Sequence, residues 1–155
     1  MSLTIIVLAA GQGVRMNSEL PKVMHTLAGR PMVRFAVDAA RALEPDNLIL
    51  VVGYRADLVR TAAGEGITFV TQEEQLGTGH AVQQAGIASG KADTVLVLYG
   101  DTPLIRPETL RQIVSHHEDT GAAATVLTSR PPDPTGYGRI VRDAGTDAVL
   151  AIVEE

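Results

Sequence analysis

Short apolar runs alternate along this chain with longer segments that mix alanine with charged residues. Such alternation is typical of strands and helices that take turns in a mostly parallel sheet. The apolar runs are almost uninterrupted, as expected of strands whose two faces are both covered by helices. The predicted strands are Thr4–Ala9, Asn47–Val52, Ile67–Thr71, Thr94–Tyr99 and Ala123–Leu127.

The segments between these runs have the spacing of amphipathic helices. Pro31 begins one of them, and Gly121 follows another at the position where a helix commonly ends. Towards the end of the chain, turn-forming residues separate two short runs, Arg139–Arg142 and Ala148–Val153, which predict a β-hairpin. The predicted helices are Pro31–Leu43, Arg55–Ala63, Thr78–Ala88 and Pro107–Thr120.

Together these elements predict an α/β fold, with a mostly parallel sheet and helices on both of its faces. A length of 155 residues allows about one such domain, so we expect a single domain over residues 1–155. The chain ends at Glu154-Glu155, directly after an apolar strand-like run. We therefore expect the domain to be truncated at its C-terminus; the alternative is that the hairpin forms a terminal edge.

Composition and charge narrow the class of protein. Thirteen basic and eighteen acidic residues give a net charge of −5, with no basic block at either end, which argues against nucleic-acid binding. The absence of cysteine excludes disulfides and thiol nucleophiles and fits a reducing compartment. The first apolar run is far shorter than the roughly 20 residues of a membrane span, so we expect a cytoplasmic protein without a membrane partner.

The segment after the first predicted strand has the character of a phosphate-binding loop. Gly11 and Gly13 allow the backbone to approach a ligand and to expose N–H groups to anionic oxygens. The third glycine of a dinucleotide-binding fingerprint is missing, because position 16 is Met. Taken alone, these glycines are explained equally well by a tight strand exit that binds no ligand.

Two cations follow this loop. Lys22 comes directly after Pro21, which favours an ordered extended loop rather than a helix. Such a loop can bring Lys22 back to the same side of the glycine loop as Arg15. Two cations beside a glycine loop would suit a polyphosphate. The alternative is a pair of solvated surface charges, the usual environment of arginine and lysine.

Two further polar segments follow predicted strands, at the edge where parallel sheets bind ligands. Asp101 follows the most hydrophobic strand, and its carboxylate suits Mg²⁺ that is also held by substrate phosphates; alternatively, it is a turn residue. Gln72 and Gln75 offer donors and acceptors that match the imide edge of a pyrimidine. Gly77 and Thr78 would bring backbone close to the base or ribose. The alternative is an ordinary polar loop in which Thr78 is the N-cap of the next helix.

Several motifs follow one another in a fixed order. They are Leu8-Ala9-Ala10-Gly11-x-Gly13-x-Arg15-Met16, Leu20-Pro21-Lys22, Gln72-x-x-Gln75-x-Gly77-Thr78-x-His80-Ala81 and Tyr99-Gly100-Asp101-x-Pro103-Leu104. This order resembles the sugar-nucleotide pyrophosphorylases, most closely the N-terminal uridylyltransferase domain of the bifunctional bacterial N-acetylglucosamine-1-phosphate uridylyltransferase/glucosamine-1-phosphate acetyltransferase. The resemblance covers essentially the whole chain and implies a Rossmann-like nucleotide-diphospho-sugar transferase fold.

The resemblance also implies a role for each matching residue. Arg15 and Lys22 would be the catalytic residues that stabilise charge on the phosphates, and Asp101 would bind Mg²⁺. Gly138 and Glu154 would contact the N-acetylglucosamine group. The implied substrate-binding residues are Leu8, Ala9, Ala10, Gly11, Gly13, Lys22, Gln72, Gln75, Gly77, Thr78, Tyr99, Gly100, Asp101, Gly138 and Glu154.

The implied reaction is nucleotidyl transfer in cell-wall precursor synthesis. A phosphate oxygen of N-acetylglucosamine-1-phosphate attacks the α-phosphorus of UTP, pyrophosphate leaves, and UDP-N-acetylglucosamine forms. Two alternatives are a fragment that binds UTP or UDP-sugar without turnover, and a sister sugar-1-phosphate nucleotidyltransferase with another base preference. The asparagine that completes the Mg²⁺ site in the family, and its trimer-forming β-helix, are not in this sequence, so no oligomeric state follows.

Overall fold

The computed structural model describes residues 2–89, 92–146 and 148–154. The chain divides into two compact units, Met1–Thr120 and Gly121–Glu155. Each unit is described by itself. Within the described residues, no helix is both long and apolar enough to cross a membrane.

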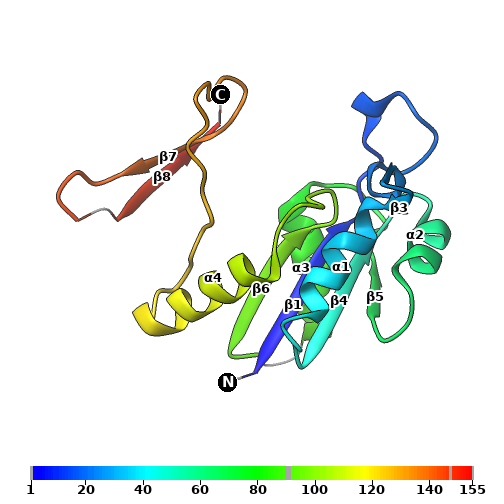
Figure 1. The fold of residues 1–155 in the computed structure, drawn as a ribbon, viewed down its shortest axis with the longest axis horizontal. Helices are drawn as coiled ribbons and strands as arrows, with labels where there is room; N and C mark the ends of the chain where they lie inside the picture. Colours follow the sequence, from blue (N-terminus) through cyan, green and yellow to red (C-terminus); the bar gives the residue numbers. More distant parts are fainter. Residues whose placement is uncertain (1, 90–91, 147, 155) are drawn as a thin grey trace. The chain divides into compact units, whose positions relative to one another are not determined.

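The first unit is built on a four-stranded parallel sheet in the order β5-β4-β1-β6 (Figure 1). Its strands are β1 (Leu3–Ala9), β4 (Asn47–Val52), β5 (Thr68–Thr71) and β6 (Thr94–Tyr99). The chain moves from β1 to one side of the sheet and later returns to its other side to form β6. This reversal makes the carboxyl end of β1 a switch point, where open α/β sheets bind their ligands.

Alternate residues of β1 enter two separate hydrophobic cores. Ile5 and Val7 pack with α1 (Met32–Arg41), α2 (Ala56–Ala63) and α4 (Pro107–Thr120). Ile6 and Leu8 point to the opposite face and pack with α3 (Thr78–Ser89). Figure 1 shows α1 crossing in front of β1 and β4. The predicted parallel sheet with helices on both faces is therefore confirmed. The four predicted strands that form it and the four predicted helices differ from those observed by at most two residues at an end.

The start of β1 is fixed by two aspartates from neighbouring connections. Leu3 donates its backbone N–H to Oδ2 of Asp46 over 2.7 Å, and Ser2 donates its own to Oδ2 of Asp93 over 2.8 Å. The backbone N–H and the hydroxyl of Ser2 stabilise the charged carboxylate, so the pKa of Asp93 is lowered from its ordinary value. These bonds anchor β1 at its N-terminal end, opposite to the switch point.

The segment between β1 and α1 contains short elements that the apolar pattern does not predict. They are the 3₁₀ turns η1 (Val14–Met16) and η2 (Lys22–Met24) and the short strands β2 (Thr26–Leu27) and β3 (Arg30–Pro31). The prediction of an extended loop at Lys22 is wrong. Pro21 itself is extended, but its carbonyl accepts the N–H of Met24 over 2.8 Å and closes a helical turn. Proline lacks only the donor, so it can begin such a turn.

The second unit contains the predicted hairpin, with β7 (Arg139–Arg142) antiparallel to β8 (Val149–Val153). The predicted strand Ala123–Leu127, in contrast, is wrong, because the described residues there have no strand partner. Its two alanines have little side-chain surface to bury, and Val126 and Leu127 are half exposed. An apolar run becomes a strand only where a neighbouring strand completes its hydrogen-bond ladder.

Candidate functional site

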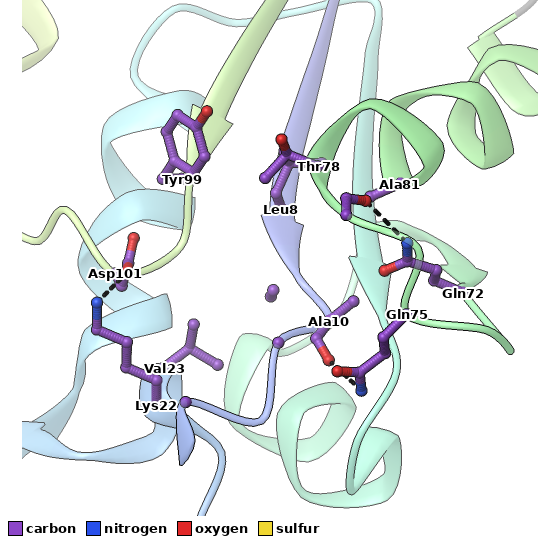
Figure 2. A pocket seen from close by; sticks show the side chains of 14 residues that line it. Leu8, Ala10, Lys22, Val23, Gln72, Gln75, Thr78, Ala81, Tyr99 and Asp101 are labelled. Carbon is purple, nitrogen blue, oxygen red and sulfur yellow. Dashed lines mark hydrogen bonds and ion pairs between the residues drawn. The ribbon is translucent and has the colours of Figure 1, made fainter. Parts of the chain in front are cut away.

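A pocket of about 350 Å³ lies at the carboxyl ends of β1, β5 and β6, within the first unit. This volume is within the range of ~300–1,000 Å³ that small-molecule sites occupy. Figure 2 shows Lys22 and Asp101 on one side of the pocket and Gln72 and Gln75 on the other. The lining residues are Leu8, Ala9, Ala10, Gly11, Gly13, Lys22, Val23, Gln72, Gln75, Gly77, Thr78, Ala81, Tyr99 and Asp101.

The glycine loop, residues 10–13, forms the floor between these two sides. Gly13 has φ +74°, a left-handed conformation that other residues adopt only under strain. A Cβ atom added to Gly13 would lie 2.6 Å from the Cβ atom of Lys22. The glycine therefore serves two needs, because it permits the turn and leaves room for the backbone that carries Lys22.

The acidic side of the pocket depends on close contact between β6 and β1. Gly100 donates its backbone N–H to the carbonyl of Leu8 over 2.9 Å, and an added Cβ atom would lie 3.1 Å from that oxygen. The next residue, Asp101, extends into the pocket, where its Oδ2 atom lies 2.7 Å from Nζ of Lys22. This ion pair joins the ends of two segments that are far apart in the sequence, and neither side chain is fully buried.

The opposite side of the pocket is the glutamine loop, residues 72–77. Gln72 is 4% exposed and donates from Nε2 to the carbonyl of Gly77 over 3.1 Å. Gln75 reaches across to the glycine loop and donates from Nε2 to the carbonyl of Ala10, also over 3.1 Å (Figure 2). The pocket thus places a cation, a carboxylate, open backbone at two glycines and two amide side chains around one cavity.

The comparison with protein families agrees with this arrangement. Residues 5–151 match the family described as the MobA-like NTP transferase domain. The chain belongs to this family. It is also 55% identical over 157 residues to the bifunctional protein GlmU of Geobacter metallireducens, a match that covers 99% of the chain and 33% of that protein. The resemblance to the N-terminal uridylyltransferase domain of GlmU is confirmed.

The length of the match limits what it shows. The NTP transferase chain spans about a third of the length of the curated GlmU relatives that it matches. The activities of the whole relatives are therefore not carried over by the match alone.

Solved structures of related proteins extend the comparison. Rv0371c from Mycobacterium tuberculosis in complex with manganese is 28% identical, with a TM-score of 0.61, over 74% of this NTP transferase and 59% of that chain. UDP-glucose pyrophosphorylase complexed with UDP-glucose has a TM-score of 0.73 over 99% of this chain and 69% of that chain. Its identity of 20% shows a shared fold alone.

Most of the predicted site residues line the pocket of this NTP transferase, but four do not. Arg15 lies exposed on η1 and is not among the lining residues, so its predicted position beside Lys22 is not seen. Gly100 is buried and is not among the lining residues. Gly138 and Glu154 belong to the second unit, where a Cβ atom added to the glycine would lie 3.3 Å from Oε2 of the glutamate. The hairpin therefore brings these two predicted sugar-binding residues together.

Sequence reasoning missed two apolar lining residues, Val23 and Ala81. Val23 is 4% exposed and belongs to the same core as α1 and α2, so it holds the turn that carries Lys22 against the sheet. Ala81 lies one turn into α3 and is 3% exposed. Val23 directly follows Lys22, and Ala81 directly follows His80. Their position next to these polar residues of the motifs is the signal that could have identified them.

Replacing Gln75 by leucine is expected to loosen the glycine loop in the absence of nucleotide. The substitution removes one of two donors to the Ala10 carbonyl, the other being the backbone N–H of Tyr54, and one such hydrogen bond contributes about 1 kcal/mol. Amide hydrogen exchange of Tyr54, whose N–H donates to the same Ala10 carbonyl over 3.2 Å, should accelerate about fivefold, with little change in Tm. Glu74→Ala, at the exposed neighbouring position, is the matched control and should leave this exchange unchanged. Equal exchange in the Gln75→Leu variant and the wild type would contradict the expected role.

Proposed function

We propose that this chain is the nucleotide-binding part of a cytoplasmic uridylyltransferase that acts in peptidoglycan precursor synthesis. It would join UTP and N-acetylglucosamine-1-phosphate to give UDP-N-acetylglucosamine and pyrophosphate. The observation that supports this proposal most strongly is the pocket that combines the glycine loop, the Lys22–Asp101 pair and the amides of Gln72 and Gln75. The similarity to GlmU supports the choice of reaction and substrates.

In this proposal the chain binds and orients the triphosphate without forming a covalent intermediate. Backbone N–H groups of the glycine loop face the phosphate oxygens, and the ammonium of Lys22 stabilises the charge that develops on them. A phosphate oxygen of the sugar phosphate forms a new bond to the α-phosphorus. The bond from that phosphorus to the β-phosphate oxygen breaks, and the electron pair leaves with pyrophosphate.

The residues present fit a divalent cation. Asp101 contributes a hard carboxylate inside the pocket, and Mg²⁺ commonly binds one or two carboxylates together with substrate phosphates. When bound by Asp101 and the nucleotide, Mg²⁺ would neutralise phosphate charge. The structural similarity to Rv0371c, whose crystal structure is a complex with manganese, also supports a divalent cation here.

The hairpin is the proposed site of contact with the sugar. The carboxylate of Glu154 accepts hydrogen bonds only, so it suits the hydroxyl or amide donors of N-acetylglucosamine. Gly138 leaves the space next to that carboxylate free of a side chain. Together they would distinguish the sugar phosphate from inorganic phosphate.

Calorimetric titration of the 155-residue chain with nucleotides in the presence of Mg²⁺ tests the proposed binding. We expect UTP to bind at least about ten times more tightly than CTP, because the amides of Gln72 and Gln75 match an imide edge. GTP and dTTP complete the comparison and test for a sister enzyme with another base preference. Failure to bind UTP would overturn the proposal.

Release of pyrophosphate from UTP and N-acetylglucosamine-1-phosphate then tests catalysis. We expect release that depends on both substrates and on Mg²⁺. Binding of UTP without pyrophosphate release, followed by recovery when the chain is extended towards the length of its relatives, would favour the fragment that binds without turnover.

A further inference from the structure

The side chain of Gln72 is held in a single orientation by the protein. Its backbone N–H bonds to the carbonyl of Val52 over 2.8 Å, which continues the β4–β5 ladder by one residue. Its Nε2 atom lies 3.1 Å from the carbonyl of Gly77 and 3.0 Å from Nδ1 of His80. A carbonyl can only accept a hydrogen bond, so the group that faces Gly77 must be the NH₂ end of the amide.

This orientation determines the tautomer of His80. The second hydrogen of the Gln72 amide points at Nδ1, which must therefore be the accepting nitrogen. The ring proton is then on Nε2, which lies 3.0 Å from Nε2 of Gln84 on the next turn of α3. Two donors would face each other there, so the amide of Gln84 must turn by 180° and present its oxygen to that N–H. The opposite tautomer would place two donors, His80 and Gln72, against each other.

The amide oxygen of Gln72 remains available to the pocket. Among the described residues no group donates to it, and Figure 2 shows this oxygen turned towards the cavity. An oxygen at this place accepts a hydrogen bond from a ring N–H. Uracil has a donor at N3, whereas cytosine has an acceptor there, so the direction of the amide separates the two bases.

We propose that His80 is a positioning residue, which selects imide bases by holding the Gln72 amide oxygen towards the nucleotide. The inference rests on the proposed function and adds the residue that decides its base preference. His80 does not touch the base itself and does not line the pocket. Without an acceptor at Nδ1, the Gly77 carbonyl is the one acceptor that remains among the described residues for the Gln72 NH₂ group, so the amide turns more readily and presents that group to the pocket, which suits cytosine.

The test is the ratio of UTP to CTP affinity, measured by calorimetry on the full chain with Mg²⁺. His80→Phe removes the acceptor and keeps the ring shape, and we expect the ratio to fall about tenfold. His80→Asn places a side-chain oxygen near the position of Nδ1 and should restore most of the ratio. The ratio of UTP to dTTP affinity should not change, because thymine has the same N3–H donor.

A second variant tests the same network without changing His80. Gln84→Lys puts a group with three donors and no acceptor beside Nε2, which forces the ring proton onto Nδ1. We expect this variant to lower the UTP/CTP ratio as His80→Phe does, and it carries the test alone if His80→Phe does not fold. Gln83→Lys introduces the same charge at an exposed position of the same helix and is the matched control.

Each outcome decides between the hypotheses. An unchanged ratio in His80→Phe and Gln84→Lys, or an equal loss of affinity for both nucleotides, would overturn the positioning role and leave the proposed function intact. Failure of the wild-type chain to prefer UTP over CTP would overturn the proposed function and this inference with it.

Discussion

Replacing Lys22 by alanine is expected to slow pyrophosphate release by about 10²–10³-fold, the effect of removing one group that stabilises transition-state charge. The ammonium of Lys22 lies at the mouth of the pocket, 2.7 Å from Asp101, where the nucleotide phosphates would bind. Its exposed fraction of 43% means that the ion pair contributes only about 0–1 kcal/mol to folding. Stability should therefore change little, and single-turnover kinetics with UTP would measure the loss.

Arg106→Ala provides the matched control for this substitution. It also removes one positive charge, from an exposed residue that does not line the pocket, so it should leave both the rate and Tm unchanged. The Tm of each variant shows whether a slow rate reflects a damaged fold. Near-normal pyrophosphate release by a folded Lys22→Ala variant would overturn the assignment of Lys22 as a catalytic residue.

Replacing Gly13 by alanine is expected to lower both stability and nucleotide affinity. Its φ of +74° costs an alanine about 1 kcal/mol, and the added Cβ atom would lie only 2.6 Å from the Cβ atom of Lys22. Both contacting atoms are next to the backbone, so the glycine loop or the η2 turn must move. We expect the free energy of unfolding, measured in urea, to fall by about 2–3 kcal/mol and UTP affinity to fall about tenfold or more.

Two other glycines separate the causes of this effect. Gly29 has φ +78° but no atom within 4 Å of an added Cβ, so Gly29→Ala measures the conformational strain alone. Gly11 has neither a positive φ nor a neighbour within 4 Å, so Gly11→Ala should not change the free energy of unfolding. If Gly13→Ala is no less stable than Gly29→Ala, the close approach to Lys22 contributes nothing to the loss in the free energy of unfolding.

The elements that could be predicted are those whose signal is local. The strand Asn47–Val52 is a continuous apolar run, and the helix Pro107–Thr120 starts at a proline and is followed by a glycine. Their bounds match the prediction because periodicity and end signals act over a few residues. The run Ala123–Leu127 has a similar apolar character but is not a strand, because pairing depends on a neighbour that the local sequence does not specify.

The candidate site, too, could be predicted from the sequence only where the signal is local. The sequence alone identifies the glycine loop, Lys22 and Asp101 as residues of the right chemistry, and their order points to the family. It does not show that Lys22 and Asp101 form an ion pair, or that Arg15 lies outside the pocket lining. It also assigns no role to His80, because the contact with Gln72 exists only when α3 and the end of β5 fold together.

By itself, then, the sequence determined an α/β domain of the NTP transferase family and the residue types of its pocket. Apolar periodicity, glycines after a strand and a strand-terminal aspartate act through neighbouring residues, and these are readable without a structure. The tertiary structure decided which of these residues share one cavity, which way the amide of Gln72 faces, and why Gly13 must lack a side chain. Those features depend on distances between segments that only the packing of the sheet brings together.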